Sequence, residues 1–165
     1  PKIWLINQQL GMGALKYFLL KVDPKKRMMF NPAESIDFQG NTGPFIQYTH
    51  ARIKSIIRKA TELNINTTWV LDPTITLAAA EKELVYLVAQ YKLKIEEAAT
   101  QLAPSVIAQY VYDLAKEFNK FYNELSILNE ENEDSRNIRL NLASLTGKTI
   151  KASLALLGIV APQRM

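Results

Sequence analysis

Several features are scarce or missing in this 165-residue sequence. It contains no cysteine, which excludes disulfides and thiolate chemistry and makes a cytoplasmic location the default prediction. No apolar run approaches the roughly 20 residues that a helix needs to cross a bilayer, and no secretory signal is visible, so no membrane partner is expected. Only six glycines and seven prolines occur, and they cluster at the predicted ends of elements.

Catalytic constellations are also missing. The single histidine, His50, has no cysteine and no second histidine with which to build a metal cluster or a nucleophilic triad. The segment Thr146-Gly-Lys-Thr149 looks like the end of a phosphate-binding loop, but that motif needs a glycine where Leu142 stands. We therefore predict no catalytic residue and no metal ligand, and we interpret His50 as structural or as a residue close to the ligand.

The hydrophobic content of the sequence is high enough for a packed core. Hydrophobic residues make up 48% of the chain, and the length fits one domain, or one domain with a short piece of another. Charge is uneven, because residues 1–60 hold ten Lys and Arg against three Asp and Glu, whereas residues 61–165 hold ten against thirteen. This asymmetry favours a polyanionic partner, and a solvated surface with an uneven charge count is the alternative.

Apolar residues recur at three- and four-residue steps along most of the chain, which predicts amphipathic helices. A dense apolar helix near the start ends at Asp23-Pro24, and Met28, Met29 and Phe30 follow as a short strand or a packed extended segment. Polar residues 64–76 predict a loop. Further helices are predicted over residues 44–63, 84–102 with a break near 91–93, 104–128 and 135–157. The predicted fold class is therefore all-α, a helical bundle with short connections.

The ends of the last helix also carry signals. An acidic loop, residues 129–134, supplies Asp134 or Ser135 as the predicted N-cap, and Gly158 is placed to cap the C-terminal end. Two apolar stripes give this helix a wide apolar face, so we expect it to be the central helix of the bundle.

Residues 36–60 organise the rest of the chain. They begin as a turn-rich loop in which Gly40 and Gly43 are expected to adopt angles that a side chain forbids, and Pro44 suits the first turn of a helix. One helical stripe is apolar and faces a core. The opposite stripe combines an aromatic ring with cations, and its members stand at steps of four, three and four: Tyr48, Arg52, Ser55 and Lys59.

Three segments carry a family resemblance: Gly40-Asn-Thr-Gly-Pro-Phe-Ile-Gln-Tyr-Thr-His-Ala-Arg52, Gly11-Met-Gly-Ala-Leu-Lys-Tyr-Phe18, and the final ten residues, Leu156 to Met165. They resemble the C-terminal part of arginyl-tRNA synthetases, a class I family of arginine–tRNA ligases. The resemblance implies a DALR-type anticodon-binding helical domain over residues 41–165. Residues 1–40 would be a short remnant of the catalytic domain, in the region that contacts the tRNA stem.

The resemblance also implies what this piece does and what it lacks. It would bind the anticodon loop of arginine tRNA and position it for ATP-dependent aminoacylation by a missing N-terminal catalytic domain, which would be its other partner. The nucleotide-binding signatures of class I synthetases are absent from the sequence. ATP and Mg²⁺ would therefore belong to the parent enzyme, no cofactor is expected here, and the piece would be inactive alone.

Site residues are predicted from both lines of reasoning. Single-stranded RNA is bound by stacking bases on aromatic rings and by neutralising phosphates with Lys and Arg, and Tyr48, Arg52 and Lys59 offer both groups on one stripe. The resemblance adds Tyr122 and Met165 as residues near the anticodon. Some family members carry tryptophan four residues after the tyrosine, where this chain has Ser126. The alternative is that these aromatics only border the core.

Two further expectations complete the prediction. Lys25, Lys26 and Arg27 would contact phosphates on the tRNA stem, with a solvated loop as the equal alternative. Apolar surface on residues 1–40 would let the isolated piece self-associate. The competing functional hypothesis is a helical protein-interaction module without RNA binding, which would dock partners through the aromatic edge of the long helix.

Overall fold

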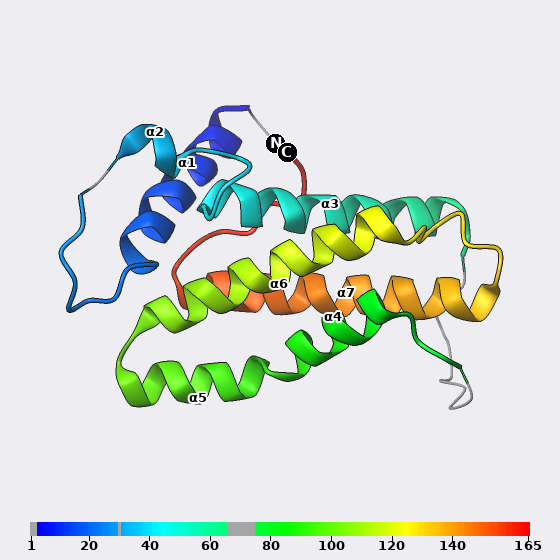
Figure 1. Cartoon of the computed structure of the whole chain (residues 1–165). Coiled ribbons are helices and arrows are strands. Elements are labelled where there is room, and N and C mark those ends of the chain that lie inside the picture. The colour runs from blue at the N-terminus through cyan, green and yellow to red at the C-terminus, as the bar shows by residue number, and fades with distance from the viewer. Residues whose placement is uncertain (1–2, 30, 66–74) are drawn as a thin grey trace.

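The computed structural model describes residues 3–29, 31–65 and 75–165, and every regular element in these ranges is an α-helix (Figure 1). The all-α fold class predicted from the sequence is therefore confirmed. The helices in chain order are α1 Ile3–Leu20, α2 Pro32–Ser35, α3 Gly43–Glu62, α4 Ala79–Ala89, α5 Tyr91–Gln101, α6 Pro104–Glu124 and α7 Glu133–Leu156.

Helix α6 is the centre of the bundle, and the expectation that the last helix would be central is wrong. In Figure 1, α6 runs obliquely across α7, with α3 above it and α4 and α5 below it, and it packs against all of these and α1. Its apolar stripe is buried along its length, at Ile107, Val111, Leu114, Phe118 and Phe121. Helix α7 packs against α3, α4 and α6, while its outer side leaves Leu145 and Leu156 exposed.

Small residues bring α3 and α7 close together. A Cβ added to Gly147 would lie 2.8 Å from Cγ2 of the buried Ile53, so no larger side chain fits without movement. Gly147 also lies inside α7. The segment Thr146-Gly-Lys-Thr149 is therefore a helix contact, which agrees with rejecting it as a phosphate loop.

Helix α1 is held against the bundle through a second close approach. A Cβ added to Gly43 would collide with the carbonyl of Gly13, and neither Gly40 nor Gly43 has a positive φ. The predicted reason for Gly43 was wrong, because this glycine provides room for a neighbouring backbone rather than a left-handed conformation. Nearby, the buried Tyr17 hydroxyl donates to Ala108 O of α6 at 2.9 Å, and burial raises the pKa of Tyr17.

Some predicted boundaries shift. Helix α7 begins two residues earlier than expected, because the Asn132 side chain, rather than Asp134 or Ser135, is the N-cap and accepts the N–H of Ser135 at 2.8 Å. Helix α6 ends at Glu124, and Leu125 is extended, although it still packs on the core. At the other end of α7, Gly158 has φ +66°, which confirms it as the C-terminal cap.

Other differences concern connecting segments. Helix α2 was not predicted, because four residues are too short for a periodic signal. Met29 is 91% exposed, so the expectation that it packs is wrong, while Phe30 and residues 66–74 of the predicted loop lie outside the described residues. No described helix combines the length and apolar character needed to cross a membrane.

Candidate nucleic-acid interface

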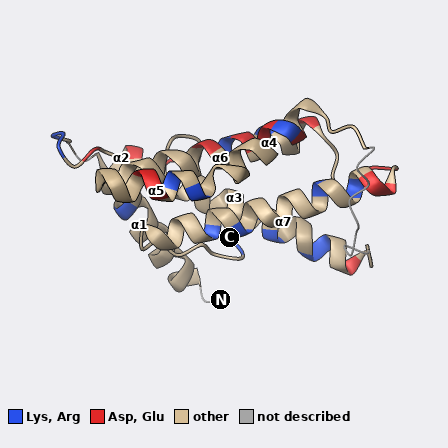
Figure 2. Ribbon diagram, turned by 90° about the horizontal axis from the view of Figure 1, so that it is seen from below, with Lys and Arg blue, Asp and Glu red and all other residues tan. Residues whose placement is uncertain are grey.

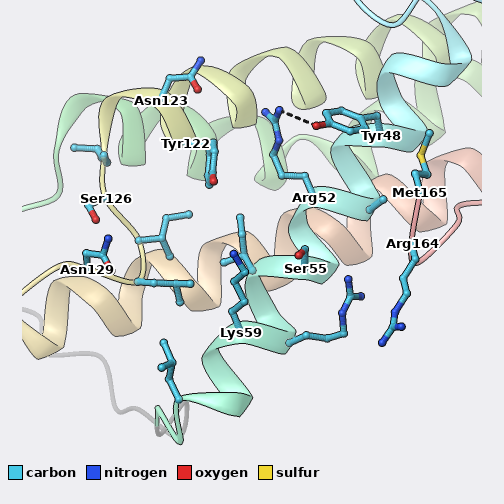
Figure 3. Close-up of a pocket in the computed structure, with 17 residues that line it drawn as sticks. Tyr48, Arg52, Ser55, Lys59, Tyr122, Asn123, Ser126, Asn129, Arg164 and Met165 are labelled. Carbon is cyan, nitrogen blue, oxygen red and sulfur yellow. Dashed lines mark hydrogen bonds between the residues drawn. The ribbon is translucent and has the colours of Figure 1, made fainter.

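A cavity of about 1140 Å³ opens between α3, the end of α6 with the loop that follows it, and the C-terminal tail (Figure 3). All five residues predicted as principal contacts line it: Tyr48, Arg52, Lys59, Tyr122 and Met165. Tyr48 and Tyr122 are about two-fifths exposed, so their rings are available from solvent. The structure thus brings together residues from three segments that are far apart in the sequence.

The guanidinium of Arg52 lies between the two tyrosines. Its Cζ is 4.9 Å from the centre of the Tyr48 ring and 5.2 Å from the centre of the Tyr122 ring, which is cation–π distance for both. Its Nη2 also donates to the Tyr48 hydroxyl at 3.5 Å (Figure 3). One cation therefore orients two aromatic rings that border the same opening.

Asn119 of α6 fixes the inner side of this guanidinium. Its Oδ1 accepts from Nη1 of Arg52, while its Nδ2 donates to Thr49 Oγ1 at 2.8 Å and to Ala115 O at 2.9 Å. These contacts determine which way the amide points. Among the described residues, Arg52 pairs with no carboxylate. Its positive charge is therefore held in place and remains unneutralised.

The cavity is cationic. Arg52, Arg58, Lys59 and Arg164 line it, and no aspartate or glutamate of the described chain does. Helix α3 carries no acidic residue before Glu62, and α7 carries acidic residues only in its first turn, as the red segments in Figure 2 show. The arrangement favours an anionic ligand with planar groups that can stack on the exposed rings.

The C-terminal tail forms one wall and is tied to α3. Gln47 Nε2 donates to Val160 O at 2.8 Å, His50 Nδ1 donates to Pro162 O at 2.8 Å, and Arg58 Nη1 donates to Gln163 O at 3.0 Å. His50 is fully buried, and this burial lowers its pKa. His50 is therefore structural, as one of the two predicted alternatives stated.

The loop after α6 forms the opposite wall and is held by Arg139 of α7. Arg139 Nη1 donates to Ser126 O at 2.7 Å and to a carboxylate oxygen of Glu130, and Nε donates to the buried Glu81 at 2.8 Å. Ser126 and Asn129 of this loop line the cavity. Ser126 supplies a small polar group at a point where an aromatic ring would narrow the opening.

A second hollow of about 720 Å³ adjoins the first on the side of α1. It is mainly apolar, with Leu10, Phe38 and Phe45 in its lining, and it shares Tyr48, Arg52 and Met165 with the larger cavity. The Phe38 ring meets the Tyr48 ring edge-on, with centres 6.5 Å apart. Tyr48 is thus presented to two neighbouring openings.

The structure does not bring Lys25, Lys26 and Arg27 to this site. They are exposed in the turn after α1, and none of them lines either opening. Their contact with tRNA phosphates stays a prediction. No group of three or more metal-ligating side chains occurs in the part of the chain that the structure describes.

Sequence reasoning missed several residues of the site. Asn119, Asn123, Asn129 and Arg164 were not singled out, although two of them directly adjoin Tyr122 and Met165. For Asn119 a signal was present, since it is a polar residue next to the apolar stripe of a long helix. No sequence signal pointed to the ties between α3 and the tail, because their partners are more than 100 residues apart.

Comparison with known proteins identifies the family of this chain. The DALR anticodon binding domain family matches residues 46–165. An arginine–tRNA ligase of Phocaeicola vulgatus is 51% identical over 160 residues, which is 97% of this chain and 26% of that protein. One from Bacteroides fragilis is 52% identical over 160 residues, covering 97% and 27%. The chain therefore spans about a quarter of the length of these curated relatives.

Solved structures of arginyl-tRNA synthetases are also similar to this chain. The Thermus thermophilus arginyl-tRNA synthetase matches with a TM-score of 0.85 and 33% identity over 96% of this chain and 27% of that one. The Plasmodium falciparum enzyme matches with a TM-score of 0.86 and 28% identity over 99% and 28%. The matched range contains the five predicted site residues that line the cavity, and the chain belongs to the DALR anticodon-binding domain family.

Proposed function

We propose that this chain binds the anticodon loop of arginine tRNA and acts as the anticodon-binding part of an arginine–tRNA ligase. The observation that carries the proposal is the cavity in which Arg52 lies between Tyr48 and Tyr122. Unpaired bases of an RNA loop stack on aromatic rings, while cations neutralise the adjacent phosphates. The same cavity supplies both groups.

The size of the cavity supports an extended ligand. Its volume of about 1140 Å³ exceeds the roughly 300–1,000 Å³ of pockets for single small molecules. Its cations lie on different walls, since Lys59 belongs to α3 and Arg164 to the tail. This spacing suits successive phosphates along a strand, which would pass between the walls with its bases turned toward the tyrosines.

The same proposal assigns separate roles to this chain and to the catalytic domain of the whole enzyme. Residues 41–165 would form the anticodon-binding domain, and residues 1–40 would join it to the catalytic domain. ATP and Mg²⁺ would be held by that catalytic domain, in the cytoplasm, and this chain would position the tRNA. The exposed apolar side chains of α1, including Trp4, Met12 and Leu19, would pack against the catalytic domain in the whole enzyme. In its absence they would promote self-association.

Filter binding of labelled arginine tRNA tests the proposal. With four phosphates neutralised, the logarithm of the affinity should fall with the logarithm of salt with a slope of about −3, so binding weakens roughly fifty-fold between 50 and 200 mM salt. Tyr48→Ala should reduce the preference for the cognate anticodon over a swapped one. Tyr86→Ala is the matched control, because Tyr86 is exposed on α4 and lines neither opening.

Two outcomes would contradict the proposal. If the tRNA is not retained at any salt concentration, the proposal that this chain binds RNA is wrong. If wild type and Tyr48→Ala show equal preference for cognate and swapped anticodons, Tyr48 has no role in discrimination.

A further inference from the structure

The C-terminal tail has no regular structure, so its backbone needs hydrogen-bond partners from elsewhere. Helix α7 ends at Leu156, and Gly158 at φ +66° turns the chain back. Ile159 then enters the core, and residues 160–165 continue along α3 without forming a helix or strand. Buried carbonyls in such a segment must find donors on side chains or water.

Helix α3 provides those donors from one face. Gln47 and His50 are both 0% exposed, and they bond to Val160 O and Pro162 O at 2.8 Å each. A carbonyl only accepts, so Nδ1 of His50 carries the proton in this bond. Nε2 of His50 is buried and has no partner in the described chain. The Pro162 bond is thus the polar contact that the structure records for this histidine.

These ties determine where the tail ends. Arg164 and Met165, two and three residues after Pro162, line the cavity, with Met165 beside Tyr48 (Figure 3). Gln47 and His50 are themselves buried and do not line the cavity. The bonds to the tail are a route by which both residues can influence a ligand. For His50 the tail holds the only hydrogen-bond partner of its side chain in the described chain, whereas Gln47 Nε2 also donates to Gln9 O of α1 at 3.2 Å.

We propose that Gln47 and His50 are positioning residues that hold the tail so that Arg164 and Met165 form a wall of the RNA-binding cavity. This inference rests on the proposed function, because it assigns a role to the wall in binding the anticodon loop. Without the two bonds, the tail would keep the exposed bond from Arg58 to Gln163 O but would lose both of its buried side-chain ties, so its tip could move out of the cavity. The ligand would then lose a cation and a thioether contact together.

The test compares binding of an RNA hairpin that carries the anticodon stem and loop of arginine tRNA. His50→Leu keeps the apolar bulk and removes the donor, and His50→Asn keeps a donor near the Nδ1 position. We expect His50→Leu to bind about tenfold more weakly, and His50→Asn to bind within about twofold of wild type. Gln47→Leu should also weaken binding by at least as much as His50→Leu, because it removes the bond to Val160 O together with a bond to Gln9 O of α1.

A double-mutant cycle separates positioning from general damage. In a tail-tip variant, with Arg164→Ala and Met165→Ala together, adding His50→Leu should weaken binding by less than about twofold. Carboxypeptidase digestion followed by mass spectrometry reports the tail directly. We expect faster removal of Met165 and Arg164 from His50→Leu than from wild type or His50→Asn.

The outcomes distinguish this inference from the proposed function. If wild type does not bind the hairpin, the proposed function fails. If wild type binds but His50→Leu binds equally well, the positioning role is wrong. The same conclusion follows if His50→Leu weakens binding by the full factor in the tail-tip variant, or if it leaves the rate of digestion unchanged.

Discussion

Replacing Asn119 by leucine removes the anchor of the Arg52 guanidinium while keeping the side-chain volume. The wild-type amide bonds to Arg52, to Thr49 Oγ1 at 2.8 Å and to Ala115 O at 2.9 Å. Two of these partners keep another bond in the variant. Thr49 Oγ1 still donates to Phe45 O at 2.9 Å, and Arg52 is half-buried and can reach water.

The expected loss in the free energy of unfolding follows from these remaining partners. Because no group is left both buried and unpaired, the loss should be near that of one or two ordinary hydrogen bonds, about 1–2 kcal/mol in the free energy of unfolding. For a chain of this length that corresponds to a fall in Tm of roughly 3–6 °C. RNA binding should weaken by about tenfold, since the freed guanidinium no longer orients Tyr48 and Tyr122.

Asn119→Asp separates the charge of Arg52 from its position. The carboxylate would still hold the guanidinium and would neutralise it, but its second oxygen cannot donate to Thr49 Oγ1 or to Ala115 O. The thermal stability should therefore fall, and RNA binding should weaken although the guanidinium stays in place. The assays are thermal unfolding by circular dichroism and filter binding of arginine tRNA at fixed salt. The reasoning is refuted if Asn119→Asp binds as tightly as wild type, because the positive charge would then contribute nothing. It is also refuted if Asn119→Leu changes neither property.

Three further predictions concern stability. Gly147→Ala should destabilise the fold by about 1–3 kcal/mol, because the added Cβ meets Ile53 of α3. Gly11→Ala should stabilise it by about 0.5–1 kcal/mol, since nothing lies within 4 Å of the Cβ that would be added there. Denaturant unfolding of both variants measures the two changes. Arg139→Met should cost about 3–5 kcal/mol by leaving the buried Glu81 carboxylate without its cation, although the N–H of Ala78 still donates to it, and adding Glu81→Gln should recover part of that loss in the same assay. Burial lowers the pKa of His50 below 6.5, so the unfolded state binds more protons just below that pH. The free energy of unfolding should therefore fall on acidification below about pH 6.5, with a slope of at most about 1.4 kcal/mol per pH unit from this group, and His50→Asn should lack this component.

The helices could be predicted because their signal is local. The apolar spacing of α3 and α6 and the glycine after α7 each depend on neighbours within a few residues. The failures that concern helix packing depended on other parts of the chain. The role of Gly43 is set by the backbone of Gly13, and the central place of α6 results from helices packing on several of its sides.

The candidate site divides in the same way. Tyr48, Arg52 and Lys59 form a stripe that helical spacing reveals, whereas Tyr122 and Met165 were predicted through the family resemblance. The bond between Asn119 and Arg52 and the ties from α3 to the backbone of the tail join residues that are 67 to 113 positions apart. No periodic pattern encodes such a pair, because either partner alone is an ordinary polar residue in a helix or an ordinary carbonyl.

The three walls of the cavity share one physical design. Each wall presents groups to the solvent, and each is held by a hydrogen bond from a polar side chain that does not line the large cavity. Asn119 bonds to Arg52, Arg139 bonds to the loop at Ser126, and His50 bonds to the tail at Pro162. A site held in this way loses little conformational entropy when a ligand binds. The adjustment on binding should therefore fall mainly on the RNA, whose loop bases must unstack to reach the tyrosines. Discrimination would then depend on the cost of unstacking as well as on contacts inside the cavity.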